Sequence, residues 1–279
     1  MEKTYFIGVD IGGSRIKAVI RDDNSILKEK IINTNSNLDK DIIIQSIINL
    51  IQDLFNFVEL DKNNNSHVCC IGVGVPGIFE ENGKIINLPN LSVLNGVNFS
   101  SIFKEEFGSN IKVKIVNDAT LPFYYYKSLN DVESKNILFL TLGTGIGSSL
   151  CLNGNLHTSK FNSTEISRCY MFGDKICEDL ISEKYLLTDL DGNLEDNKDK
   201  IKFDFYGKNL GLVISNLHNV LGFDKVVLSG GICKFEKYFY SDLVSEFEKK
   251  SYFKACDVEI LKNVDDLEIG AVGASYLFD

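Results

Sequence analysis

The sequence has no apolar run that approaches the length of a membrane span, and no G-x-x-x-x-G-K-[ST] motif. The first absence excludes a membrane-spanning helix, and the second argues against a P-loop fold. Basic residues are also scarce, since 29 Lys and Arg stand against 39 Asp and Glu, a formal net charge of -10. Because acids and bases are interspersed, we expect no basic face for nucleic acid or an anionic membrane, and small molecules are the expected partners.

The number of cysteines is odd, and most of them lie inside apolar runs, as expected of buried thiols in a reducing compartment. They are Cys69, Cys70, Cys151, Cys169, Cys177, Cys233 and Cys256. The first predicted strand starts within a few residues of Met1, from which we expect neither a signal peptide nor an N-terminal DNA-binding helix-turn-helix. We therefore expect a cytoplasmic protein. The chain of 279 residues, 44% hydrophobic, is long enough for a large core in one domain or in two closely apposed lobes.

Residues 6–20 are the first chemically informative segment, with an apolar strand, a glycine turn led by Asp10, and a second apolar strand. Gly12 and Gly13 let the backbone bring its N–H groups close to a ligand. Asp10 can hold a cation or its waters, while Ser14 and Lys17 can reach phosphate oxygens. The pattern alone is also compatible with an ordinary two-strand turn.

Residues 136–150 repeat the order of strand, glycine turn and strand, with Thr144 and Gly145 in the turn. The duplication indicates two similar lobes. Two lobes that each aim a glycine hairpin into a shared cleft can hold the phosphates of one nucleotide from both sides, an arrangement suited to phosphoryl transfer.

Strands and helices alternate along the chain. Strands are predicted at 25–32, 68–75, 111–116 and 225–229, and helices at 41–55, 100–107, 205–221, 235–249 and 267–277. The last helix has a small-residue face suited to close packing on a sheet. The polar stretch 189–200 is predicted as a surface loop, and Leu194 and Lys200 exclude a calcium loop there. A G-x-G-x-x-G match at Gly72, Gly74 and Gly77 is interpreted as accidental, because Pro76 and a hairpin-like segment follow instead of a helix.

Asn117 and Asp118 stand where a predicted strand ends and a helix begins. Residues at the carboxyl ends of parallel strands face the ligand crevice, and a carboxylate there can accept the proton of an attacking hydroxyl. Helix capping also explains these two residues, and is the better explanation when they are considered in isolation. A further strand ends at Ser229-Gly230-Gly231, where the glycines permit close approach to a ligand or form a plain turn.

The order of these motifs resembles the ROK family of repressors, open reading frames and kinases. The matching segments are Asp10-Ile11-Gly12-Gly13-Ser14, Val75-Pro76-Gly77, Leu88-Pro89-Asn90-Leu91, Asn117-Asp118-Ala119, Leu142-Gly143-Thr144-Gly145-Ile146-Gly147, Asn153-Gly154 and Ser229-Gly230-Gly231. Each motif is weak alone, but the ordered set is strong and spans nearly the whole chain.

The resemblance implies an α/β, two-lobed actin-like ATPase (ribonuclease H-like) fold with a nucleotide and sugar cleft between the lobes, usually as a homodimer. We expect residues 1–117 with 266–279 as a small lobe and 118–265 as a large lobe. It implies Asp118 as general base and ATP with Mg²⁺ as cosubstrate. The implied sugar ligands are Gly77, Asn90, Asn117, Asp118 and Glu165, and the implied ATP ligands are Asp10, Gly12, Gly13, Ser14, Lys17, Thr144, Gly145, Gly230 and Gly231.

The sequence departs from the family at its zinc loop. Where members have Ala-Gly-Glu-x-Gly-His, this chain has Glu165 but Arg168 in place of the histidine, and the downstream cysteine cluster is reduced to Cys169 and Cys177. A tetrahedral zinc site needs four ligands, so we predict no zinc. The family's second sugar-binding glutamate aligns with Asp179, with Glu178 as a rival. Arg168 either bridges Glu165 or Asp179 or is a solvated surface residue.

We therefore expect an ATP-dependent kinase of a hexose or N-acylhexosamine, with N-acetylmannosamine and glucose as the leading candidates. Two alternatives stay open from sequence. One is a catalytically silent sugar-binding regulator of the same fold. The other is an iron–sulfur ATPase activator of a radical dehydratase, which needs two cysteines per chain at a dimer interface.

Overall fold

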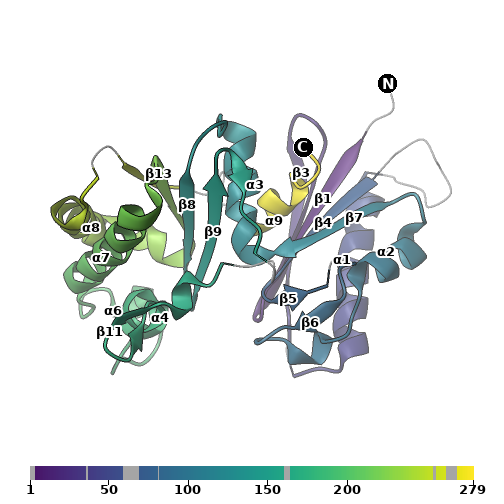
Figure 1. Ribbon diagram of the computed structural model, residues 1–279. Helices are drawn as coiled ribbons and strands as arrows, with labels where there is room; N and C mark the ends of the chain where they lie inside the picture. Colours follow the sequence, from purple (N-terminus) through teal and green to yellow (C-terminus); the bar gives the residue numbers. More distant parts are fainter. Residues whose placement is uncertain are drawn as a thin grey trace. The chain divides into compact units, whose positions relative to one another are not determined.

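The computed structural model describes residues 4–35, 37–58, 69–80, 82–159, 164–253, 256–261 and 269–279 (Figure 1). The chain divides into unit 1, drawn from Met1–Asp131, Thr158–Ser163 and Asn263–Asp279, and unit 2, drawn from Val132–His157 and Thr164–Lys262. The sequence placed the end of the first lobe at residue 117. Unit 1 extends further because α3 (Leu121–Leu129) packs against α9 (Ile269–Ser275), which belongs to the same unit.

Unit 1 is built on a five-stranded sheet in the order β3-β2-β1-β4-β7. The strands β1 and β2 form the predicted antiparallel hairpin, β3 continues it, and β4 and β7 run parallel to β1. Their bounds are β1 Tyr5–Ile11, β2 Arg15–Arg21, β3 Ile26–Asn33, β4 Cys69–Val75 and β7 Lys112–Asn117. A small hairpin of β5 (Ile78–Phe79) and β6 (Ile85–Asn87) lies between β4 and β7 in the chain, followed by η1 (Ser92–Leu94) and α2 (Phe99–Phe107).

The two faces of this sheet are covered by different helices. Because side chains alternate along a strand, Ile7 and Val9 of β1 point into the core shared with α1 (Lys40–Phe57). Gly8 faces the other way, where a Cβ atom would lie 1.9 Å from the carbonyl oxygen of Ala271 in α9. The final helix therefore packs on the sheet through glycine, in the manner its small-residue composition predicts.

Unit 2 repeats the sheet order of unit 1 as β10-β9-β8-β13-β14, with β8 and β9 as the second predicted hairpin and β13 and β14 parallel to β8. The bounds are β8 Ile137–Leu142, β9 Ile146–Leu152, β10 Asn155–Leu156, β13 Lys225–Ser229 and β14 Asp257–Ile260. Short elements connect β10 to the long helices, namely η3 (Ile166–Arg168), β11 (Tyr170–Phe172), β12 (Lys175–Ile176), α4 (Glu178–Ile181), α5 (Glu183–Leu186) and α6 (Leu194–Asn197).

The helices α7 (Phe203–Leu221) and α8 (Glu236–Lys250), with η4 (Gly231–Phe235) before α8, form the helical layer of unit 2 (Figure 1). They lie against one another at Gly207 and Gly211 of α7. A Cβ atom at Gly207 would lie 2.4 Å from the carbonyl oxygen of Phe239 and one at Gly211 2.5 Å from that of Leu243. The absence of side chains at these positions allows the two helices to approach closely, and the buried Tyr206 and Phe239 rings meet edge to face beside them.

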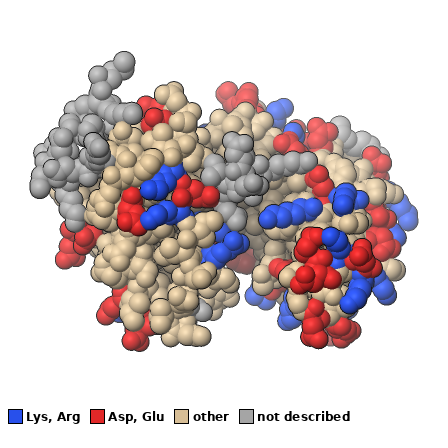
Figure 2. All heavy atoms as spheres, turned by 180° about the vertical axis from the view of Figure 1, so that it is seen from behind, with Lys and Arg blue, Asp and Glu red and all other residues tan. Residues whose placement is uncertain are grey.

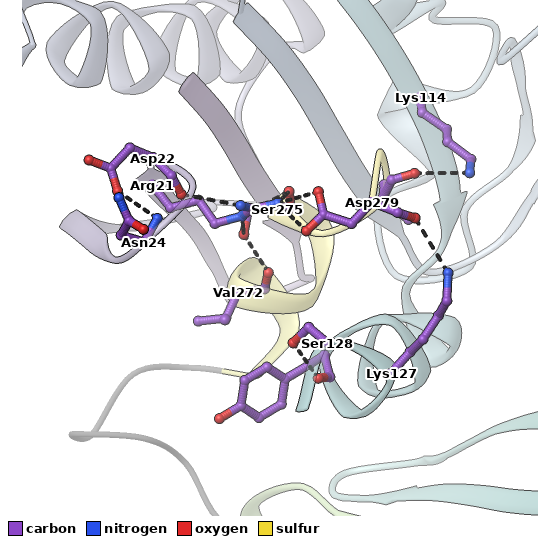
Figure 3. Close-up of polar contacts among 11 residues, drawn as sticks. Arg21, Asp22, Asn24, Lys114, Lys127, Ser128, Val272, Ser275 and Asp279 are labelled. Atoms are coloured by element: carbon purple, nitrogen blue, oxygen red, sulfur yellow. Dashed lines mark hydrogen bonds and ion pairs between the residues drawn. The ribbon is translucent and has the colours of Figure 1, made fainter. Parts of the chain in front are cut away.

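The last residue of unit 1 is tied to the first hairpin by a buried arginine. The Arg21 guanidinium at the end of β2 donates to Asp279 and to the backbone carbonyl oxygen of Ser275 (Figure 3). It lies 4.0 Å from the ring centres of both Phe6 and Tyr276. This contact fixes the C-terminal turn against the sheet.

The structure changes one prediction on secondary structure. Residues 189–200 are not a plain loop, because α6 forms within them, capped by the Asn193 side chain, which accepts from the Asp196 backbone N–H. Leu194 and Asn197 are buried, so this polar stretch contributes to the core of unit 2. The remaining predicted helices and strands form at nearly the predicted bounds. Val68, Leu267 and Glu268, predicted as the first residues of β4 and α9, lie outside the described residues.

The match at Gly72, Gly74 and Gly77 leads into the β5–β6 hairpin, not into a helix, in agreement with its interpretation as accidental. On the face in Figure 2, Lys and Arg lie among Asp and Glu. Among the described residues, no helix is both long and apolar enough to cross a membrane.

Candidate functional site

The glycine turn of the first hairpin lies between a carboxylate and an ammonium group. In the β1–β2 register Asp10 is paired with Lys17, and Lys17 Nζ lies 3.8 Å from Asp10 Oδ2. The Gly12 N–H donates to the Arg15 carbonyl oxygen at 3.0 Å and closes the turn, with Ser14 exposed at its tip. The turn thus presents backbone N–H groups, a hydroxyl and an ammonium group of the kinds that bind phosphate, beside a carboxylate able to bind a cation.

Two residues outside the hairpin hold this turn in place. The backbone N–H of Thr34 donates to the Ser14 carbonyl oxygen at 3.0 Å, and its hydroxyl donates to the Gly12 carbonyl oxygen at 2.7 Å. Asn90 packs on Gly13, where a Cβ atom would lie 3.1 Å from the Asn90 Cβ. The expected sugar residue Asn90 is therefore next to the first glycine hairpin. Thr34 was missed from the sequence, because nothing distinguishes it from other polar residues after a strand.

The sheet of unit 1 brings Asp10 and the Asn117-Asp118 pair to one edge. Asp10 is in register with Gly74 of β4, and Gly74 is in register with Val116 of β7. Asn117 is the last residue of β7 and Asp118 follows it, so both stand at the carboxyl end of the parallel strands. This is the edge at which ligands bind in open α/β sheets.

Asn117 caps the turn that carries Asp118. The buried Asn117 side chain accepts from the Ala119 N–H at 3.0 Å and donates to the Gly77 carbonyl oxygen at 3.1 Å. Gly77 packs on β6, where a Cβ atom would lie 2.1 Å from the Asn87 carbonyl oxygen. The capping explanation is therefore correct for Asn117, and the same two hydrogen bonds connect Gly77 to the turn of Asp118 (η2, Asp118–Thr120).

In unit 2, the second glycine hairpin is held from outside by α5. The Gly143 N–H donates to the Gly145 carbonyl oxygen at 3.1 Å within the turn. The Gly143 carbonyl oxygen accepts from the Glu183 N–H at 2.9 Å, and the Thr144 hydroxyl donates to Glu183 Oε2 at 3.3 Å. Thr144 and Gly145 are exposed. Glu183 was not predicted, because a helix of four residues gives no periodic signal in the sequence.

The glycines after β13 lie at the same end of the unit 2 sheet as this hairpin. Ser229 is in register with Thr141 of β8, and their hydroxyl groups are 3.2 Å apart. Gly230 has a φ of 98°, and a Cβ atom there would lie 2.4 Å from the Leu142 carbonyl oxygen. Glycine is thus required at 230, both for the backbone conformation and for contact with the end of β8.

The turn that carries Glu165 is anchored to β9. The Ser148 hydroxyl accepts from the Ile166 N–H at 3.4 Å and donates to the Thr164 carbonyl oxygen. Within the turn, the Ser167 hydroxyl donates to Glu165 Oε2 at 3.3 Å. Glu165 is exposed, so its carboxylate is available to a ligand.

Glu178 and Asp179 point to different neighbours. Asp179 Oδ2 accepts from the Ile176 N–H at 3.1 Å and so stabilises the turn after β12. Glu178 Oε2 lies 3.1 Å from where a Cβ atom of Gly145 would be, against the second glycine hairpin. The position selected by alignment to the family, Asp179, thus has a local structural role, while its rival Glu178 lies at the candidate nucleotide site.

Arg168 lies exposed in η3. Among the described residues it forms no ion pair with Glu165 or Asp179, so the bridging role considered from the sequence is not seen. The described part of the chain also contains no group of three or more His, Cys, Asp or Glu side chains placed to hold a metal ion.

The comparisons with known proteins identify the family. The ROK family model matches residues 6–178. The chain belongs to the ROK family. Among its relatives are a xylose repressor of Bacillus spizizenii, 25% identical with 89% of this chain and 70% of that protein covered, and a glucokinase of Halalkalibacterium halodurans, 24% identical with 99% and 96% covered. An uncharacterised Clostridium perfringens protein, CPE0188, is 30% identical, with 84% and 83% covered.

Solved ROK structures have the same fold. A ROK hexokinase from Thermus thermophilus superposes with a TM-score of 0.79 at 17% identity, over 98% of this chain and 97% of that one. A ROK glucokinase from Streptomyces griseus, in complex with glucose and AMPPNP, gives 0.75 at 16% identity, over 98% of both chains. The predicted actin-like ATPase fold is confirmed. ROK membership also argues against the iron–sulfur activator considered from the sequence.

Proposed function

We propose that this ROK protein is an ATP-dependent kinase that phosphorylates a hydroxyl group of a hexose or N-acylhexosamine, with N-acetylmannosamine and glucose as the leading candidates. The observation that carries the proposal is the register of unit 1. Asp118 follows the end of β7. At this end β7 is paired with β4, and β4 is paired with β1 at Asp10, next to the glycine hairpin. A candidate base and a candidate phosphate turn thus leave one sheet edge.

In this mechanism Asp118 acts as general base. Its carboxylate accepts the proton of the sugar hydroxyl as the hydroxyl oxygen attacks the γ-phosphate of ATP. The cap made by Asn117 fixes the turn, so that Asp118 needs little reorganisation when the sugar binds. Asp10 supplies a hard oxygen of the type Mg²⁺ prefers and would hold the metal or its waters, and Mg²⁺ bound to the nucleotide would offset charge on the phosphates.

The proposed sugar ligands are Gly77, Asn90, Asn117 and Asp118, together with Glu165, Arg168 and one of the two acidic residues after Cys177. Of these two acidic residues, Glu178 is the one whose carboxylate lies against the second glycine hairpin. The Asp179 carboxylate accepts a local backbone hydrogen bond from Ile176 instead. Exposed Glu165 offers two carboxylate oxygens to sugar hydroxyl groups.

The proposed ATP ligands are Asp10, Gly12, Gly13, Ser14 and Lys17, and Thr144, Gly145, Gly230 and Gly231. Glu178 and Glu183 next to the second hairpin make direct phosphate contact there less favourable than at the first. We therefore assign the charged γ-phosphate to the first hairpin. A homodimer and a cytoplasmic location are part of the proposal.

The test is a coupled ADP-release assay of the purified protein over a panel of hexoses and N-acylhexosamines. Sugar-dependent ADP release, absent without sugar, supports the kinase. ADP release that no sugar stimulates contradicts it.

A second candidate, a sugar-binding regulator, is favoured by one observation. The match to the xylose repressor of Bacillus spizizenii covers 89% of this chain. The regulator predicts sugar binding in calorimetry without sugar-dependent ADP release. The same sugar panel therefore separates the two functions.

A further inference from the structure

Two cysteines stand opposite each other at the base of the hairpin formed by β11 and β12. Tyr170 is in register with Ile176, and the next pair outward in this antiparallel ladder is Cys169 with Cys177. The Cys177 N–H donates to the Cys169 carbonyl oxygen at 2.9 Å, which continues the pairing to these two residues. The pair makes one of the two bonds of a hydrogen-bonded antiparallel pair, since the Cys169 N–H donates to the Ile166 carbonyl oxygen instead. Residues that exchange both bonds have Cα atoms about 5.5 Å apart. Disulfides span about 4.4–6.8 Å between Cα atoms, a range that includes this spacing, and the Cys169 thiol is near enough to Cys177 to raise its pKa.

The geometry points to a reversible disulfide between Cys169 and Cys177 that closes the base of this hairpin. Both cysteines are free thiols in the structure. A disulfide in a protein of a reducing compartment is typically transient and regulatory. The pair is thus a thiol modification site next to the turn of Glu165.

The two thiols differ in access, which sets the order of events. Cys169 is exposed and meets an oxidant first, whereas Cys177 is buried. Burial raises the pKa of the Cys177 thiol to about 12, and the facing Cys169 adds to the effect. A thiol with so high a pKa is not stabilised as a thiolate, so the reduced state gains little. We therefore expect the disulfide, once formed, to be reduced by a strong dithiol and not by weak reductants.

The oxidant we assign is a hydroperoxide. The Cys169 thiolate sulfur attacks a peroxide oxygen, the O–O bond breaks, and the departing hydroxide takes a proton to become water, leaving a sulfenic acid. The Cys177 sulfur then attacks the Cys169 sulfur, the S–O bond breaks, and water leaves with the Cys177 proton. In sum, two thiols are oxidised to one disulfide, and one hydrogen peroxide is reduced to two water molecules.

The disulfide would alter the turn of Glu165. In the reduced structure Cys169 Sγ lies 4.0 Å from the Glu165 carbonyl oxygen, and the Arg168 N–H donates to the same oxygen at 3.1 Å. Rotation of the Cys169 side chain toward Cys177 removes the sulfur contact and shifts the turn. This consequence for activity rests on the proposed sugar-binding role of Glu165.

The first test is a peptide map of the full chain treated with hydrogen peroxide and digested without reduction. A Cys169–Cys177 link, absent after dithiothreitol and absent in Cys169→Ser, is the expected result. The matched control is Cys256→Ser, which removes a half-buried cysteine elsewhere in unit 2 and should leave the link intact. Over-oxidation of Cys169 to sulfinic acid without any link, or a link to another cysteine, would overturn the disulfide. Because Cys169 is exposed, its serine variant is expected to fold.

The second test measures sugar phosphorylation before and after peroxide. The oxidised protein should show a sugar KM raised about tenfold, the factor lost with one charge-assisted hydrogen bond, with the KM for ATP unchanged. Dithiothreitol should restore the value, and Cys169→Ser should not respond. An unchanged sugar KM in linked protein would overturn the effect on Glu165. If no sugar is phosphorylated at all, the proposed function fails, while the peptide map still decides on the disulfide.

Discussion

Arg21 binds the terminal residue Asp279 through both carboxylate oxygens, at 2.7 and 2.8 Å, although the two residues are 258 positions apart in the sequence (Figure 3). Arg21 is 2% exposed, and its guanidinium also donates to the Ser275 hydroxyl at 3.2 Å. Lys114 and Lys127 donate to the Leu277 and Asp279 carbonyl oxygens from two other elements of unit 1. The C-terminal turn is therefore fixed by cations.

Replacing Arg21 should destabilise unit 1 more than replacing its partner. Arg21→Ala removes a buried cation that packs between two rings, and we expect a loss of about 3 kcal/mol in the free energy of unfolding. Asp279→Asn should cost about 1 kcal/mol, since the Asp279 side chain is 42% exposed. Urea unfolding measures both. Lys198→Ala, which breaks an exposed ion pair with Glu195, should change stability by less than about 0.5 kcal/mol. Equal effects of all three substitutions would contradict this account.

Asp118→Asn should abolish sugar phosphorylation while leaving nucleotide binding intact. The amide cannot accept the proton, and loss of a general base typically costs a factor of about 10²–10⁴ in rate. The coupled assay gives the rate, and calorimetry with a non-hydrolysable ATP analogue gives the affinity. Asp204→Asn, on the exposed side of α7, is the control and should keep full activity. Near-normal turnover in Asp118→Asn would rule out the assigned role.

Gly230 and Gly231 should respond differently to the same substitution. Gly230→Ala places a methyl group 2.4 Å from the Leu142 carbonyl oxygen at a φ of 98°, and such backbone strain costs about 1–3 kcal/mol. Gly231→Ala meets nothing within 4 Å, so the fold should tolerate it. Thermal melting compares the two variants. A loss of ATP affinity in stable Gly231→Ala would support close approach of the nucleotide, and equal melting temperatures would refute the strain at Gly230.

Unit 2 should lose stability as the pH falls, because of His218. Burial lowers the pKa of His218 from its ordinary value of 6.5, against a smaller opposing effect of the Phe253 carbonyl group. The unfolded chain therefore binds the proton first, so the contribution of His218 is fully present above about pH 6.5 and is lost as the pH falls below it. His218 Nδ1 accepts from the Phe223 N–H at 3.0 Å, a bond that an asparagine oxygen can replace.

The measurement is urea unfolding between about pH 7.5 and pH 5. His218→Asn should be less stable than the parent at the upper pH, since the ring packs on Phe247, but its stability should fall less steeply with acid. His157→Asn, at an exposed histidine, is the control and should keep the parent slope. Parallel curves for parent and His218→Asn would show that another group titrates.

The long elements and both glycine hairpins could be predicted from the sequence, since apolar periodicity and paired glycines are local signals. The hydrogen bonds that hold these hairpins from outside could not be predicted. Thr34 holds Gly12, and Glu183 holds Gly143, through contacts between residues distant in the chain. Short elements were also missed, because α5 and α6 have four residues each and no room for a period.

The choice between Glu178 and Asp179 shows the limit of motif alignment. Both are acidic neighbours after Cys177, and counting from the family motif selects Asp179. At the start of α4, successive residues point in different directions, so one carboxylate meets Ile176 and the other Gly145. The two residues are distinguished only by the direction in which the backbone of α4 points each side chain.

The position of α9 has a consequence for synthesis on the ribosome. Unit 1 needs residues from both ends of the chain, because α9 covers β1 and β4, whereas the body of unit 2 lies within Val132–Lys262. The sheet of unit 1 must therefore wait, with the glycine face of β1 and β4 uncovered, until α9 has emerged. Unit 2 can complete its fold earlier, so the half of the protein made first is the half finished last.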